Sequence, residues 1–275
     1  MFKLTGRMNV IKIIAKNEIE SIYYNYWFYL ILFFSFLIAS FLINSTINTV
    51  IDNEVMVLNK SLNTPMFFVV IIGTFYLAIS SLISISDEKE KGTLKVLFCG
   101  PVDSVSYISG KYIGKMVVYL GMVIFYIVYF YTISLLTNLR FSFSFLQVLF
   151  SSFFYVSCMV SFGIILASIT ESYRNSILLF IGFNFFFLAL YIFYIMIMAF
   201  PIEELSTFFR YIRSGLYYLN NIIEWLSPFS YFQRSISAAN LNIGKFIVTI
   251  IYSLLYSSLL LGCSIKIFSR KEIRK

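Results

Sequence analysis

The sequence predicts an all-α integral membrane protein with six transmembrane helices, and three observations support this. Of its 275 residues, 60% are hydrophobic and only 12% are charged, whereas about a quarter of residues are charged in ordinary soluble domains. Six uncharged runs each reach the roughly 20 residues that a helix needs to cross about 30 Å of hydrocarbon. All four prolines lie outside these runs, as expected when spanning helices are unbroken. The runs are 27–51, 66–86, 116–139, 141–170, 175–200 and 246–265.

The distribution of charge predicts the orientation of this single membrane domain, residues 1–275. Most of the 21 Lys and Arg residues fall in the two termini and in the loop 87–115 between the second and third runs. By the positive-inside rule, both termini are expected in the cytoplasm of a multi-pass protein of the cell membrane. The formal charge of +8 then reflects topology and contact with anionic membrane lipids, and it does not imply nucleic-acid binding.

Residues suited to catalysis, metal binding or cofactor binding are not apparent. Histidine is absent, and the three cysteines are Cys99, Cys158 and Cys263, which suggest neither a disulfide framework nor a zinc site. Gly110-Lys111 superficially resembles a phosphate-binding loop, but that motif needs Gly at Val105 and Ser or Thr at Tyr112. No cofactor is therefore expected on this chain, and nucleotide chemistry is assigned to another polypeptide.

The loop 87–115 is the most highly charged stretch between two apolar runs, and it predicts a short helix held between two spans. Gly92 permits a break in the chain, Thr93 is expected to cap the helix 94–99, and Gly100 is expected to end it in a left-handed conformation before Pro101. Asp103 or Ser104 is expected to cap the next helix, which continues into the third span. The i, i+3, i+4 spacing of the apolar residues predicts one shared face, with Lys95 turned away. These apolar residues are Leu94, Leu97 and Phe98.

The order and spacing of acid, Gly-Thr-Leu, Pro and Gly-Lys in this loop resemble the signature of ABC type-2 transporter permeases. The resemblance implies a coupling helix that docks on a cytosolic ATPase subunit, which would bind the ATP and Mg. It also implies a second permease, identical or related, and the export of an unidentified substrate. A solvated loop whose charges only fix topology is the alternative. The residues to which the resemblance assigns the coupling role are Glu88, Glu90, Gly92, Thr93, Leu94, Pro101 and Lys111, with Leu97 and Phe98 completing the apolar face.

Residues 9–24 predict an amphipathic helix ahead of the first span. Lys12, Lys16 and Glu20 share one stripe, although Glu18 intrudes on the apolar side. The family resemblance implies an interfacial elbow helix here, and a simple N-terminal extension of the first span is the alternative.

The outer region 201–245, between the fifth and sixth spans, is rich in aromatic residues. Its length predicts two short helices, with breaks at Ser214-Gly215 and at Ser227-Pro228. The resemblance implies re-entrant outer helices, which are read either as a lid over an exit path or as packing at the headgroup level.

The spanning runs contain no Asp, Glu, Lys, Arg or His, which argues against proton- or ion-coupled transport. The leading interpretation is therefore a permease subunit, itself not an enzyme, that is powered by a separate ATPase. A membrane-embedded lipid-modifying enzyme and a noncatalytic membrane scaffold are the alternatives. The enzyme would need clustered carboxylates or His at a membrane face, and the acidic residues 87–90 are instead interleaved with Lys.

Overall fold

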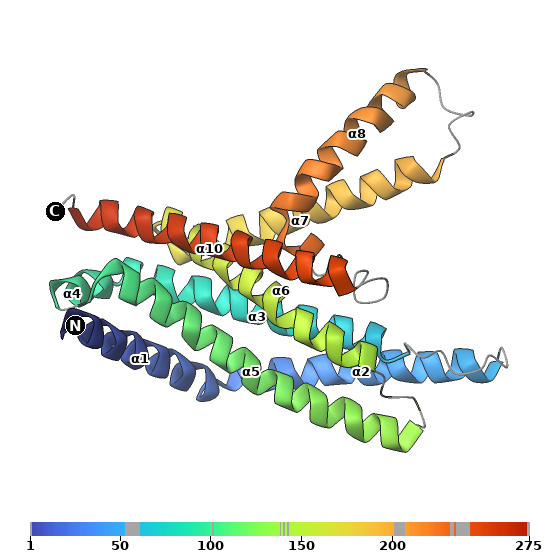
Figure 1. Ribbon diagram of the computed structural model, residues 1–275, viewed down its shortest axis with the longest axis horizontal. Coiled ribbons are helices and arrows are strands. Elements are labelled where there is room, and N and C mark those ends of the chain that lie inside the picture. Colours follow the sequence, from blue (N-terminus) through green and yellow to red (C-terminus); the bar gives the residue numbers. More distant parts are fainter. Residues whose placement is uncertain are drawn as a thin grey trace.

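The computed structural model describes residues 2–52, 61–100, 102–137, 139, 141, 143–200, 207–231, 234 and 243–273. Within these ranges the chain is helical and contains no strand (Figure 1). Six helices are long and apolar enough to cross a membrane, namely α2, α3, α5, α6, α7 and α10. The all-α membrane architecture is thereby confirmed. The bounds are α1 (Phe2–Tyr23), α2 (Tyr26–Asp52), α3 (Asn63–Glu90), α4 (Thr93–Cys99), α5 (Ser104–Thr137), α6 (Phe143–Ile169), α7 (Tyr173–Ala199), α8 (Thr207–Leu226) and α10 (Ile243–Ile273).

Five of the six spanning helices are longer than the uncharged runs that predict them, and α6 lies within the run 141–170. Helical structure satisfies the backbone amides and carbonyls wherever the chain borders lipid. Pro65 lies in the first turn of α3, where a missing amide costs nothing. Helix α5 has 34 residues, roughly 51 Å at about 1.5 Å per residue, which exceeds the thickness of the hydrocarbon. The charged first third of α5 therefore continues the helix beyond the apolar part of the span.

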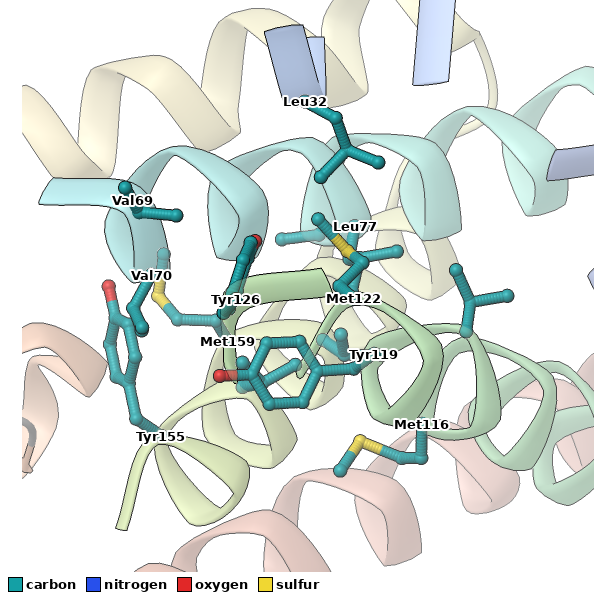
Figure 2. Packing of buried hydrophobic residues seen from close by; sticks show 14 of the residues in the cluster. Leu32, Val69, Val70, Leu77, Met116, Tyr119, Met122, Tyr126, Tyr155 and Met159 are labelled. Atoms are coloured by element: carbon teal, nitrogen blue, oxygen red, sulfur yellow. The ribbon is translucent and has the colours of Figure 1, made fainter. Parts of the chain in front are cut away.

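Helix α6 lies at the centre of the bundle and contacts α3, α5, α7 and α10. In the most apolar stretch of α6, 72% of the residues are buried, whereas the share is 11% in the corresponding stretches of α7 and of α10. Gly163 allows α3 to approach α6 closely, because a Cβ there would lie 2.7 Å from the backbone oxygen of Ala78. The core beside it is built from buried tyrosine and methionine side chains, among them Tyr119, Met122 and Met159 (Figure 2).

Helix α1 begins at Phe2 and lies along the first half of α5, with which it makes extensive contact (Figure 1). It thus starts earlier than the predicted 9–24. At its far end, the side-chain oxygen of Asn25 accepts a 3.0 Å hydrogen bond from the Trp27 amide and so supports the first turn of α2. The interfacial position of α1 stays a prediction.

Helices α7 and α8 form a hairpin that diverges from the other helices (Figure 1). The predicted break at Ser214-Gly215 is wrong, because α8 continues through both residues, whereas the break at Ser227 before Pro228 is confirmed. A glycine inside a helix costs about 1 kcal/mol, and the strong segregation of apolar side chains onto one face of α8 outweighs that cost. Residues 201–206 and 235–242 lie outside the described residues, and the re-entrant and lid assignments of this region stay predictions.

We expect Gly163→Val to destabilise the bundle, whereas Gly182→Val should have little effect. The valine at 163 would press on the α3 backbone, and overpacking of this kind typically costs about 1–3 kcal/mol. Gly182 has no heavy atom within 4 Å of a built Cβ, so it is the matched control in another spanning helix. Thermal unfolding of the detergent-purified variants measures the difference, and equal melting temperatures would show that α3 and α6 are not in close contact.

Candidate functional site

The short helix α4 lies at the same end of the bundle as both termini (Figure 1), which we call the α4 end. Gly92 precedes it with φ +73°, the left-handed conformation that glycine adopts readily. Thr93 is the first helical residue and not the predicted cap, and its hydroxyl donates to the Glu88 carbonyl at 3.1 Å. Gly100 is extended (φ −90°, ψ −168°), so the predicted left-handed end is also wrong. Asp103 does cap α5, since its Oδ1 accepts from the Ser106 amide at 3.3 Å.

The apolar residues of α4 do not all face the same surroundings. Leu94 and Phe98 are half-buried against the core, and the Phe98 ring meets Tyr107 edge-on at 5.8 Å. Leu97 is 37% exposed and borders a cavity of about 440 Å³ between α1, α3 and α5. Val96, which is 75% exposed, points away from the bundle together with the exposed Lys95 and Cys99.

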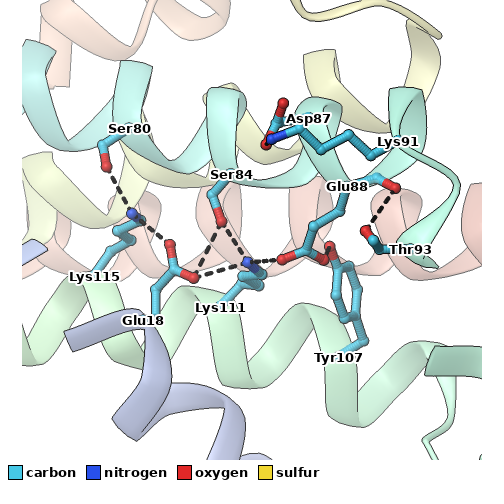
Figure 3. A network of polar contacts seen from close by, with 10 residues as sticks. All are labelled: Glu18, Ser80, Ser84, Asp87, Glu88, Lys91, Thr93, Tyr107, Lys111 and Lys115. Atoms are coloured by element: carbon cyan, nitrogen blue, oxygen red, sulfur yellow. Dashed lines mark hydrogen bonds and ion pairs between the residues drawn. The ribbon is translucent and has the colours of Figure 1, made fainter. Parts of the chain in front are cut away.

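Beside α4, oppositely charged side chains from three helices form a buried ionic cluster of Glu18, Glu88, Lys111 and Lys115 (Figure 3). Lys111 Nζ lies 2.8 Å from Glu18 Oε2 and 2.6 Å from Glu88 Oε1. Lys115 Nζ lies 2.6 Å from Glu18 Oε1 and donates to Ser80 Oγ at 2.8 Å. The two carboxylates and two ammonium groups compensate one another, which is the condition for burying such charges.

Glu18 stays ionised inside this cluster. Burial alone would raise its pKa, but the ammonium groups of Lys115 and Lys111 outweigh burial and lower the pKa from 4.5 to about 2. The carboxylate therefore remains a permanent anion of α1 at physiological pH.

Two glycines of α5 provide the room that α1 needs to bring Glu18 to the lysines. A Cβ at Gly110 would lie 2.8 Å from the Ile14 side chain, and one at Gly114 would lie 2.8 Å from Glu18 Cβ. Near the start of both helices, Arg7 Nη2 lies 3.0 Å from Asp103 Oδ2. Helix α1 is thus held to α5 by ion pairs at two levels.

The end of α3 caps the turn between α6 and α7. Lys89 Nζ donates to the carbonyls of Ala167, Ser168 (2.9 Å) and Thr170 (3.0 Å), and it lies 4.7 Å from the Phe268 ring centroid. The adjacent Glu90 Oε2 accepts from the Tyr173 amide at 3.2 Å, at the first residue of α7. A cation at a helix C-terminus and an anion at an N-terminus both complement the helix dipole.

The residues of the predicted coupling site are therefore distributed over several contacts. Glu88 and Lys111 lie in the ionic cluster, Glu90 lies at the α7 terminus, and Gly92 and Thr93 begin α4. The predicted Pro101 lies outside the described residues. Leu94 and Phe98 pack inward, and Leu97 lies at the cavity rim. The coupling role of these residues stays a prediction.

Four residues of these contacts were not predicted from the sequence, namely Glu18, Lys89, Val96 and Lys115. Only Glu18 had a signal in the sequence, because it intrudes on the apolar side of its helix.

A family model described as ABC-2 family transporter protein matches residues 12–273. The chain belongs to the ABC-2 transporter family. The match spans α4, the ionic cluster and all six spanning helices. This multi-pass membrane protein is thus the membrane permease subunit of an ABC transporter, and such a subunit is not itself catalytic. No curated protein matches the chain.

We expect Glu18→Gln to destabilise this permease by about 3–5 kcal/mol, because it leaves buried lysine charge uncompensated. Glu20→Gln, which affects an exposed carboxylate paired with Lys16 at 3.6 Å, should change stability by less than about 0.5 kcal/mol. Adding Lys115→Met to Glu18→Gln removes the orphaned charge and should restore most of the loss. Thermal unfolding in detergent measures all three, and no rescue in the double variant would argue against charge compensation.

Proposed function

We propose that the chain is the permease subunit of an ABC exporter, driven by ATP that a separate cytosolic ATPase subunit hydrolyses with Mg. The permease works as a dimer with a second copy or a related permease. The observation that carries the proposal is α4, a short helix that exposes Lys95, Val96 and Cys99 while its other face packs on the bundle. The occurrence of both termini at the same end as α4 supports their cytoplasmic placement (Figure 1).

The outward face of α4 is the proposed docking surface for the ATPase. Val96 presents an exposed apolar side chain beside the exposed charge of Lys95, a combination suited to a pocket lined by apolar and acidic groups. Glu88 and Lys111 serve this docking indirectly, because their charges are engaged in the ionic cluster. In this proposal the ionic cluster stabilises the position of α4, and α4 itself contacts the ATPase subunit.

Displacement of α4 passes to the other helices through the two helices that flank it. Helix α3 carries the α6–α7 turn with it, because Lys89 and Glu90 cap that turn. Helix α5 carries α1 through the ionic cluster. In this mechanism, closure of the ATPase dimer tilts α3 and α5 and changes access to the substrate path.

We expect Val96→Asp to weaken association with the ATPase by about tenfold or more, since it places a charge in an apolar contact. Tyr24→Asp is the control, because Tyr24 is even more exposed (89%) but lies at the junction of α1 and α2. Affinity purification of the tagged chain from its native membranes, with stoichiometry of the co-purifying protein, measures the effect. Recovery of the unaltered chain without an ATPase in several mild detergents would instead favour a lipid-modifying enzyme or a scaffold.

We expect Lys89→Met to leave ATPase association intact but to abolish the ATP-dependent movement of α7. Methionine keeps the apolar stem on Phe268 and removes the ammonium that caps α6. The control is Lys91→Met, because Lys91 pairs with Asp87 at 2.6 Å on the surface of the same segment. The reporter is Leu188→Cys on α7, in a chain whose native cysteines are replaced by serine. The rate at which a thiol-reactive reagent labels this cysteine, with and without ATP, is the measurement. An unchanged ATP response in Lys89→Met would remove Lys89 from the path of transmission.

A further inference from the structure

A groove of about 550 Å³ runs between α3, α7 and α8, and no residue of α4 lines it. Its volume falls in the range of roughly 300–1,000 Å³ found for sites that hold small molecules. Two of its side chains, Phe185 and Leu188, remain 70% and 47% exposed. Because α3 and α7 are spanning helices, the groove opens sideways, toward lipid tails.

The walls that α3 and α7 contribute are elongated and almost wholly apolar. On α3 the lining extends from Phe67 to Phe75, and on α7 it extends from Ile181 to Tyr191. These stretches correspond to roughly 12 Å and 15 Å along the helix axes. Aromatic and aliphatic side chains line them, and Asn184 is the exception. An extended alkyl chain fits such a surface better than a compact polar solute does.

The wall that α8 and the following turn contribute is mixed, and it holds most of the polar side chains of the groove. Asn220, Glu224, Ser227 and Ser230 line it together with Ile223 and Phe229. Asn220 Nδ2 donates to Glu224 Oε1 at 2.7 Å, while the Asn220 side-chain oxygen has no hydrogen-bond partner among the described residues. The charge of Glu224 is compensated by Arg234, whose Nη2 lies 2.6 Å from Oε2. The wall therefore offers hydrogen-bonding groups without net charge.

We propose that this groove binds an amphiphile with one alkyl chain and an uncharged, hydrogen-bonding head group such as a hydroxyl or a glycerol. The alkyl chain lies along α3 and α7, and the head group meets Asn220 and Ser227. An anionic or cationic head group would have to compete with the Glu224–Arg234 ion pair. A wholly apolar occupant would leave the Asn220 oxygen without a hydrogen-bond partner, which is unfavourable in a buried site. Binding of this amphiphile is separate from the permease role, because it requires this chain alone and no ATPase subunit.

The test uses the full-length chain in phosphatidylcholine vesicles without an ATPase. The probe is a monoacylglycerol that carries a photoactivatable diazirine on its acyl chain, and mass spectrometry locates the labelled residues. We expect labelling to concentrate on α3, α7 and α8 within the groove. Unlabelled monoacylglycerol should compete about tenfold better than a fatty acid or an alkyl trimethylammonium of the same chain length.

Ile71→Trp, which fills the groove from α3, should reduce labelling by about tenfold. Leu136→Trp is its control, because Leu136 is a highly exposed residue at the end of α5 and does not line the groove. Ile223→Trp fills the groove from α8 if the α3 variant does not fold. Asn220→Leu should retain labelling but remove the preference for the uncharged head group.

Two results would overturn the proposal. One is labelling spread evenly over the lipid-facing helices and unaffected by both groove-filling variants. The other is disulfide crosslinking between two copies of a Phe185→Cys variant, with no labelling by the probe, which would make a second chain the occupant. Because no ATPase takes part, neither result bears on docking at α4, and a failure of docking would not affect this test.

Discussion

Burial of charge at the α4 end is the constraint on which the rest of the structure depends. Removing a carboxylate or an ammonium group from water costs several kcal/mol per ion, and the cost is offset only when the opposite charges meet in good geometry. Glu18 belongs to α1, Glu88 to α3, and Lys111 and Lys115 to α5. Sliding α1 along α5 by a single turn would separate these charges inside the protein. The ionic cluster thus fixes the register of three helices at once, and the glycines of α5 make that register sterically accessible.

Helix α3 joins the ionic cluster to a second set of polar contacts, the caps on the α6–α7 turn. Glu88 faces α5, while Lys89 reaches α6 and Glu90 reaches α7. Three consecutive residues at the end of one helix therefore link it to three others. Toward the opposite end the same helices meet mainly through apolar and aromatic packing. In the proposed mechanism, a displacement applied to α4 is transmitted at its own end through these directional, charge-assisted contacts.

The sequence was sufficient for features that depend on local physics. Uncharged runs of span length predicted six spanning helices, and Asp103 was one of the two residues expected to cap α5. The two errors in α4 concern its ends: Gly92, and not Thr93, occupies the N-cap position, and Gly100 is extended because a residue that precedes a proline favours that conformation. The break expected at Gly215 failed because amphipathic packing outweighs the cost of a glycine. The ionic cluster could not be predicted, because Glu18 and its partners lie more than sixty residues apart, and periodicity within one helix does not identify a partner on another.

Apolar contact area is a weak guide to what this chain binds. Lipid tails are about as apolar as leucine, so moving an apolar side chain from lipid to a protein surface gains little free energy. Unsatisfied polar groups and exposed charges carry larger differences between one partner and another. At the α4 end the exposed charge is Lys95, and in the groove the polar groups are Asn220 and Ser227. Helices α7 and α10 expose much apolar surface, but their exposure is compatible with lipid as well as with a second chain. Specificity in this permease therefore follows from its few polar positions, even though most of its surface is apolar.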